Sequence, residues 1–365
     1  MLLAAVALPA TAGAVAPTKT TTTPTTTTPT TGAAKTTIRW NAPVRIEKSL
    51  YGGLNAVSCP GTKLCVAVDN AGQVAWSTAP LSRFWHLAAV DKTNSLTAIS
   101  CPLTNFCVAV DDAGYMVWSN TPTGGLRKWA RPTKIDVAQA PGGGAAGLTA
   151  IDCPTTKLCV ATDGANPGNV IVSTDPTGGS KAWVPLKIGG TNGLGGTLAS
   201  VSCVATTFCV AAGSQHYYSS DPAGGATAWH ASGGPTAGGV LTSISCPAVT
   251  ECVGVGYGNS SIGLSDVTAH PIGGLIGWVT TAITGTPPVL GAGLVDAVGC
   301  PSIGFCVAVD GIDHAYTTTA PLTGNWIGGT AIRPKSVSQS SAISCQKTFC
   351  MVVDSAGMET AGVVH

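Results

Sequence analysis

Short runs of alternating apolar and polar residues follow one another from residue 38 to the end of the chain, and turn residues separate them. One run, L-T-A-I-S-C-P, leads through a short loop into a second run, C-V-A-V-D, as at 96–111. A third run, such as 73–77, is followed by a Gly- or Pro-rich turn and then by a run with tryptophan. Alternation of this kind is typical of half-buried strands, so each unit predicts four strands, named a, b, c and d in chain order.

The unit repeats along the chain, because its first cysteine recurs every 42 to 54 residues. Four strands in each of seven such units are the signature of a β-propeller. A β-helix has a much shorter period, and separate sandwich domains need longer units. The sequence therefore predicts an all-β, seven-bladed propeller with four-stranded antiparallel blades over residues 38–365.

Strand a and the chain ends support this interpretation. The second residue before each first cysteine is Val or Ile and the third is small, which suits a strand pressed between neighbouring blades. A tryptophan marks the predicted strand d after each of the first six cysteine pairs, whereas Trp40 precedes all the pairs, and the last unit at 341–363 lacks a strand d. We expect the N-terminal strand at Trp40 to close the last blade and leave no open edge.

The 14 cysteines form seven close pairs, a pattern that indicates an oxidising compartment. Two interpretations compete, a disulfide across each a–b hairpin and a metal site. Zinc favours two residues between cysteines, and the six histidines hold no common place in the repeat. We therefore predict no metal, no cofactor and one disulfide per blade: Cys59–Cys65, Cys101–Cys107, Cys153–Cys159, Cys203–Cys209, Cys246–Cys252, Cys300–Cys306 and Cys345–Cys350.

The N-terminal region predicts export. Residues 1–16 are an apolar run with an A-x-A-like end at Ala14 and Ala16, as in a signal peptide, but the usual positive start is missing. An uncleaved anchor or a start further upstream are the alternatives. Residues 17–37 contain 13 Thr with Pro, which predicts an extended, disordered stalk, either O-glycosylated or unmodified. We expect a secreted or cell-surface protein.

Charge and hydropathy limit the classes of partner that the chain is expected to bind. Charged residues make up 10% of the chain and the net charge is +1, so no overall field favours nucleic acid or an anionic membrane. The uncharged stretch 271–295 contains helix-breaking Gly and Pro and fits a strand d and its loop, so no membrane span is expected in the mature chain. We expect a monomer.

The turn before tryptophan resembles a known motif. Ser173, Asp175 and Gly178 precede Trp183, and a second copy contains Asp221. This pattern resembles the Asp-box (BNR) repeat of sialidase-like propellers, although two extra residues precede the Trp and only two copies keep the Asp. The repeat as a whole resembles exported actinobacterial propellers with "SCP…CVAV" units. The resemblance implies a structural turn, with the Trp covering the outer edge of the blade, and no activity.

The alternative is a sialidase-like glycoside hydrolase or another propeller hydrolase. Such enzymes hold a carboxylate with three Arg, but the six Arg here lie in or near strands d and their loops. Strand a contributes only Asp152 and Asp296, in different registers. Asp69, Asp111 and Asp354, each in D-x-x-G, are better explained as turn formers than as calcium ligands. The sequence favours a non-catalytic recognition or scaffold module.

We expect binding at the end of the propeller where b–c turns and d–a loops meet, because the d–a loops vary most in length. Polar and aromatic residues of the b–c turns are the candidates: Asp112, Tyr115, Asn166, His216, Tyr217, Tyr257, Asp310, Asp313 and His314. Tyr and His can stack on sugars or on peptide side chains. The expected partner is an extracellular glycan, a cell-wall polymer or a protein.

Overall fold

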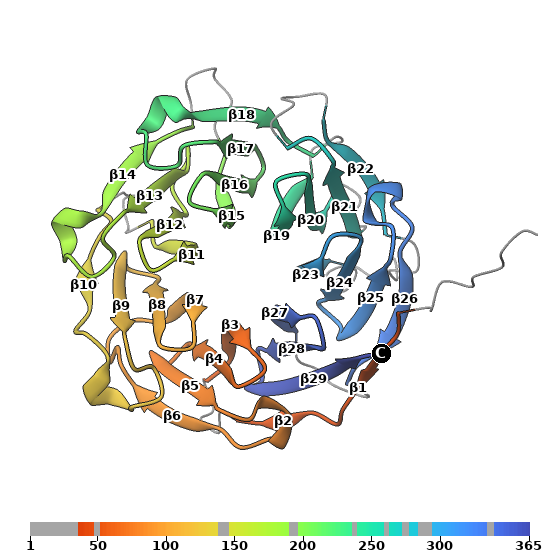
Figure 1. Ribbon diagram of the computed structural model, residues 1–365, viewed down its shortest axis with the longest axis horizontal. Coiled ribbons are helices and arrows are strands. Elements are labelled where there is room, and N and C mark those ends of the chain that lie inside the picture. Colours follow the sequence, from red (N-terminus) through yellow and green to blue (C-terminus); the bar gives the residue numbers. More distant parts are fainter. Residues whose placement is uncertain are drawn as a thin grey trace, which may run out of the picture. The chain divides into compact units, whose positions relative to one another are not determined.

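The computed structural model describes residues 36–46, 52–137, 146–189, 196–235, 239–258, 263–271, 277–283, 294–333 and 339–365. The predicted signal peptide and all but two residues of the predicted stalk lie outside these ranges. From Thr36 onward the chain is one compact unit of seven antiparallel sheets arranged in a ring (Figure 1). Among the described residues, no helix has the length and apolar character needed to cross a membrane. The predicted seven-bladed propeller is confirmed.

Two strands form the inner half of each blade (Figure 1). The innermost strands a are β3 (Leu54–Gly61), β7 (Leu96–Leu103), β11 (Leu148–Thr155), β15 (Leu198–Ala205), β19 (Val240–Ala248), β23 (Val295–Ser302) and β27 (Ser340–Gln346). The strands b, almost fully buried, are β4 (Leu64–Asp69), β8 (Phe106–Asp111), β12 (Leu158–Asp163), β16 (Phe208–Gly213), β20 (Glu251–Tyr257), β24 (Phe305–Asp310) and β28 (Phe349–Asp354).

The outer half of each blade consists of strands c and d. The strands c are β5 (Gln73–Ser77), β9 (Tyr115–Ser119), β13 (Asn169–Ser173), β17 (His216–Ser219), β21 (Gly263–Thr268), β25 (His314–Thr318) and β29 (Met358–Val364). The strands d of blades 1 to 6 are β6 (His86–Ala89), β10 (Thr133–Lys134), β14 (Val184–Lys187), β18 (Trp229–Gly233), β22 (Val279–Ala282) and β26 (Ile327–Ala331).

The N-terminus supplies the outer strand of blade 7, as expected from Trp40. Strands β1 (Ile38–Trp40) and β2 (Val44–Arg45) both pair with β29, with Ile38 opposite Val364. Thr37 and His365 also exchange both backbone hydrogen bonds. The ring is therefore closed by joining the two ends of the folded region.

All seven predicted disulfides are present, one in each blade. Each joins strand a to strand b across the a–b turn, with Cα atoms 4.0 to 4.1 Å apart. Among the described residues no cysteine is free. The close pairs in the sequence thus fasten the inner hairpin of every blade.

The apolar core lies between blades. Trp129 of blade 2 packs with Val66 and Val74 of blade 1, and Trp183 of blade 3 packs with Met116 of blade 2. Trp40 likewise packs against the core of blade 6. The tryptophan was expected to cover the outer edge of its blade, but it lies between its own blade and the preceding one, because that junction can enclose the whole indole.

The inner strands are joined by side chains. Every a–b pair has a register shift four residues before the first cysteine, and such a bulge redirects the side chain of the extra residue. Thr97 at this position donates a hydrogen bond to the Leu148 carbonyl of the next blade, at 2.6 Å. Its counterparts Asn55, Thr149 and Thr242 donate in the same way.

A second set of bonds involves the residue before the first cysteine. The Ser58 hydroxyl accepts the Cys101 N–H of the next blade at 3.0 Å, and the same contact recurs at four further serines. Asp152 replaces the serine in blade 3 and accepts from the Cys203 N–H. Blade 6 has Gly299, where a Cβ atom would lie 3.0 Å from Cys345 Sγ. Six of the seven junctions therefore share this contact.

The c–d turns use hydroxyl groups. The last Ser or Thr of strand c accepts the backbone N–H two residues on in blades 1 to 6, as in Ser173 with Asp175 N–H. The Asp175 carboxylate instead accepts the Thr177 hydroxyl. Short 3-10 helices follow in five blades: Pro80–Ser82, Leu126–Lys128, Ser180–Ala182, Ala226–Ala228 and Pro321–Thr323.

Deleting residues 38–48 should open the ring. The deletion exposes the edge of β29 and removes Trp40 from the blade 6–blade 7 junction, so we expect aggregation or a large fall in the melting temperature. Size-exclusion chromatography and thermal unfolding measure this. A deletion of residues 17–33 serves as the control, and a deletion of 38–48 that behaved like this control would contradict the closure.

Ser100→Ala should destabilise the fold by about 1–3 kcal/mol, because it leaves the buried Cys153 N–H without its acceptor. Urea unfolding of the oxidised protein provides the measurement. Thr62→Ala, at an exposed a–b turn, is the control and should change the free energy of unfolding by less than about 0.5 kcal/mol. Equal effects of the two substitutions would contradict a role for the inter-blade contact.

Candidate functional site

The b–c turns and the d–a connections lie at the same end of the propeller, which we call the b–c face. Asp residues at the ends of strands b shape it. The Asp69 carboxylate accepts the N–H groups of Ala71 and Gln73, at 2.9 and 2.7 Å. Asp111, Asp310 and Asp354 accept the equivalent pairs of amides. These residues act as turn formers, as their spacing indicated.

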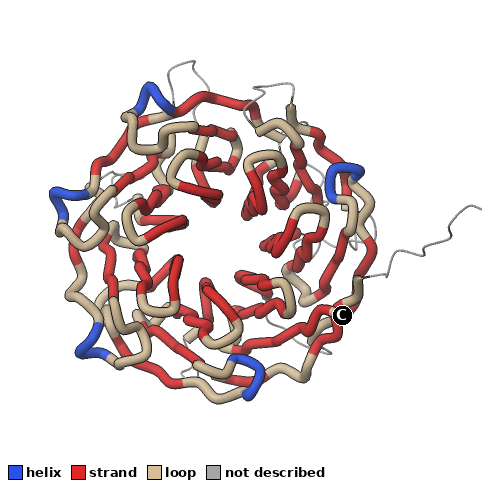
Figure 2. The backbone as a smooth tube through the Cα atoms, viewed as in Figure 1, coloured by secondary structure: helices blue, strands red, loops and turns tan. Residues whose placement is uncertain are grey.

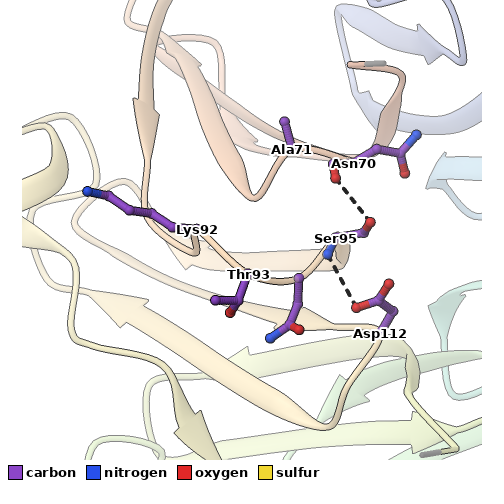
Figure 3. A pocket seen from close by; sticks show the side chains of 7 residues that line it. Asn70, Ala71, Lys92, Thr93, Ser95 and Asp112 are labelled. Carbon is purple, nitrogen blue, oxygen red and sulfur yellow. Dashed lines mark hydrogen bonds between the residues drawn. The ribbon is translucent and has the colours of Figure 1, made fainter. Parts of the chain in front are cut away.

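A hollow of about 230 Å³ opens on the b–c face between blades 1 and 2 (Figure 3). Asn70 and Ala71, residues 92–95 of the d–a connection, and Asp112 line it. Ser95 lies at its centre and donates its hydroxyl to the Asn70 carbonyl and its N–H to the Asp112 carboxylate. The Lys92 side chain extends away from these bonds (Figure 3). The lining thus presents hydroxyl, amide and charged groups to solvent.

Two buried carboxyl groups support this hollow from below. Asp91 accepts hydrogen bonds from the Thr93 N–H and hydroxyl, and Asn94 donates to both Asp91 and Asp111. Burial raises the pKa of Asp111 to about 6, and the Asp91 carboxyl contributes to that rise. Burial acts to raise the pKa of Asp91 too, but the donors of Thr93 and Asn94 outweigh it and the pKa is lowered. The loop is therefore held rigidly by its own side chains.

The junction of blades 6 and 7 places an arginine where blade 1 has Asp91, one residue after the buried apolar residue that follows strand d. Arg333 is buried and forms ion pairs with Asp313 and with Asp354, the latter at 3.3 Å. Its Nε donates to the Thr360 hydroxyl, and Ser340 donates to Asp313. This network joins the two blades and leaves these charges no access to solvent.

Asp296 lies beside this network at the bulge of strand β23. Burial raises its pKa to about 7, and the negative charges of Asp310 and Asp313 add to the effect. In blade 1 the same position is Asn55, which donates to the next blade. A carboxylate at this bulge cannot donate that hydrogen bond once it is ionised.

The nine predicted binding residues divide by exposure. Asp112 and Asn166 are exposed, and Tyr115, Tyr257 and His314 are half-buried. The other four, His216, Tyr217, Asp310 and Asp313, are buried and have no surface to offer a ligand. Asp310, Asp313 and His314 share the b–c turn of blade 6, Asp112 and Tyr115 share that of blade 2, and His216 and Tyr217 share one strand of blade 4. Asn166 and Tyr257 lie in two further blades, and of the nine only Asp112 lines the hollow.

His216 shows why exposure could not be inferred from its place in a turn. Its side chain is fully enclosed and its Nε2 is 2.8 Å from the carboxylate of Asp266 in blade 5. The ring also packs against Trp278, with centroids 4.7 Å apart. His216 therefore joins blades 4 and 5, and its substitution is expected to act through stability.

Most residues of the hollow were not predicted from the sequence. Asn70 and residues 92–95 were not among the candidates, although the unbroken polar run from Lys92 to Ser95 was a visible signal. Within the described residues, no group of three or more His, Cys, Asp and Glu side chains is placed to hold a metal ion.

No protein-family profile matches the chain, and no curated protein matches it. Solved propellers are similar in structure. One is YCF48 bound to D1 peptide, with a TM-score of 0.63, 12% identity, and coverage of 89% of this chain and 94% of that chain. Another is YCF48 from Cyanidioschyzon merolae, with a TM-score of 0.62, 14% identity, and coverage of 88% and 98%. These similarities establish a shared fold.

Asp296→Asn should stabilise the protein in a pH-dependent way. The pKa of Asp296 rises from 3.8 to about 7 on folding, so the folded chain binds more protons between these values and stability falls as pH rises through this window. The amide removes this loss. We expect a melting temperature higher by about 2 °C or more at pH 8, and little change near pH 4. Asp112→Asn, exposed on the same face, is the control, and an equal gain at both pH values would contradict the charge argument.

Proposed function

We propose that the chain is a non-catalytic recognition propeller, secreted or held at the cell surface, whose b–c face binds an extended segment of a partner protein. The observation that carries this proposal is the open polar hollow between blades 1 and 2. Its turns are fixed by Asp91, Asp111 and Asn94, so binding costs little ordering of the loop. Exposed groups on a rigid scaffold are where binding usually resides.

The carboxyl groups of this face argue against the hydrolase alternative. A glycosidase needs two carboxyl groups that reach the substrate. Asp69, Asp111, Asp310 and Asp354 are buried and accept hydrogen bonds from their own turns. The Asp313 carboxylate forms a buried ion pair with Arg333. These residues therefore build the binding surface and are poorly placed for chemistry.

Two further observations support the proposal. A disulfide in each of the seven blades suits an oxidising, extracellular compartment. The similar propeller YCF48 has been solved bound to a peptide, which makes a peptide the first ligand class to test. A glycan or a cell-wall polymer would use the same exposed polar groups.

The test is selection from a random-peptide display library on the full chain, with a glycan array and a cell-wall pull-down in parallel. Ala71→Trp fills the hollow, and Thr62→Trp places the same ring on the opposite end of the propeller. We expect selected peptides to lose tenfold or more of their affinity, about 1.4 kcal/mol, for the first variant and to keep it for the second.

Tyr257→Ala and His314→Ala extend this test to other blades, and peptides that cross the face should bind them less tightly without a change in melting temperature. Glycan binding that Ala71→Trp abolishes would keep the recognition site and replace the ligand class. Binding that responds to Thr62→Trp alone would contradict the choice of face.

A further inference from the structure

The opposite end of the propeller, formed by the a–b and c–d turns, differs in charge from the b–c face. We call it the a–b face. Its c–d turns contribute the exposed cations Arg83, Arg127, Lys128 and Lys181, and its a–b turns contribute Lys63, Lys157 and Lys347. Among the described residues the acids of this end are Asp175, Asp221 and the buried Glu251, which accepts the Gly304 N–H. The face is therefore strongly basic, although the whole chain has a net charge of only +1.

Large apolar side chains are exposed among these cations. Phe84 is 78% exposed and Ile303 is 63% exposed, at a c–d turn and an a–b turn respectively. Leu81, Leu126 and Leu322 lie exposed on the short 3-10 helices of the c–d turns or beside them, at the outer rim of the ring (Figure 2). Leu103 and Val249 add exposed apolar groups at two further a–b turns.

Local structure fixes these apolar groups in place. The residues from Leu81 to Phe84 form a tight turn, with Arg83 in the left-handed region at φ 69° and its guanidinium bonded to the Pro43 carbonyl. In blade 2, Leu126 directly precedes Arg127 and Lys128 on one helical turn. A hollow of about 140 Å³, lined mainly by apolar groups such as Val184 and Leu186, lies beside the c–d turns of blades 3 and 4. Cations and exposed apolar side chains thus occur together at one end of the ring, most closely in blades 1 and 2.

We infer that the a–b face docks on an anionic lipid bilayer. A bilayer supplies both of the required partners, since its phosphate groups attract Lys and Arg while its acyl region accepts Phe84, Ile303 and the leucines. A soluble polyanion would satisfy the cations and leave the apolar tips in water. Exposed apolar groups that gather at one end of a protein mark an interaction surface more often than groups that are scattered singly. Docking in this orientation leaves the b–c face, with its hollow, directed away from the membrane.

Vesicle flotation of the full chain tests the electrostatic half of this inference. We expect binding to phosphatidylcholine vesicles that contain about one-third phosphatidylglycerol, little binding to phosphatidylcholine alone, and loss of binding as NaCl rises from about 0.15 to about 0.5 M. Arg127→Gln with Lys128→Gln should lower the partition coefficient about tenfold or more. Lys92→Gln with Lys187→Gln, exposed away from this face, removes the same charge and should leave binding unchanged.

Phe84→Ser with Ile303→Ser tests the apolar half. Both residues are exposed, so the melting temperature should hold while the partition coefficient falls at least tenfold. Heparin, a soluble polyanion, should bind this variant and the unchanged protein equally. Vesicle binding that is unaffected by the apolar substitutions would overturn membrane docking in favour of a polyanion surface. No binding to anionic vesicles, or an equal loss in the Lys92/Lys187 control, would overturn it outright.

Peptide binding at Ala71 is measured without vesicles, so the proposed peptide recognition and the inferred membrane docking can fail separately.

Discussion

The hydrogen bond between a side chain before one cysteine and the N–H of the next blade's first cysteine is the contact on which the ring depends. Neighbouring inner strands are not paired in a common sheet, so their backbone groups need another partner. Ser58 and its counterparts supply an acceptor, and Thr97 and its counterparts supply a donor from the bulge. The disulfide beside each serine holds the cysteine N–H in the position where the next blade can use it. At most junctions the distance between neighbouring inner strands is thereby set by the short side chains of Ser and Thr.

The outer part of the ring uses packing instead. The blades diverge away from the centre, and an indole from each strand d fills the widening space, as Trp129 does between blades 1 and 2. Trp40 performs this role for blade 7. The N-terminal strand therefore contributes both backbone pairing with β29 and an indole that fills the junction. Short hydroxyl side chains join the blades near the centre, and tryptophan side chains fill the wider gap near the rim. This arrangement is repeated around the ring.

The sequence was sufficient for the architecture because the repeat places the same residue types at every blade. The disulfides, the closure by Trp40 and the turn-forming Asp residues could all be predicted from spacing. The serine and threonine of L-T-A-I-S-C-P were equally visible, but their role required a neighbour more than 40 residues away. The site was harder, because turn residues such as His216 and Asp313 differ from Asp112 only in what adjacent blades place over them. Burial at a junction is set by two blades at once, and no single repeat shows it.

The opposite characters of the two faces follow from how each turn is stabilised. In five blades the b–c turn is held by a carboxylate that accepts two amides, so these turns place acidic groups at one end. A c–d turn is held by a Ser or Thr hydroxyl and an a–b turn by a disulfide, and both devices are neutral. The exposed residues of the a–b face can therefore be basic or apolar without loss of these turn contacts, whereas the b–c turns keep the carboxylates that hold them. A ring built from these turns has two chemically distinct ends before any ligand is selected, as the proposed membrane docking at one end and the proposed partner recognition at the other require.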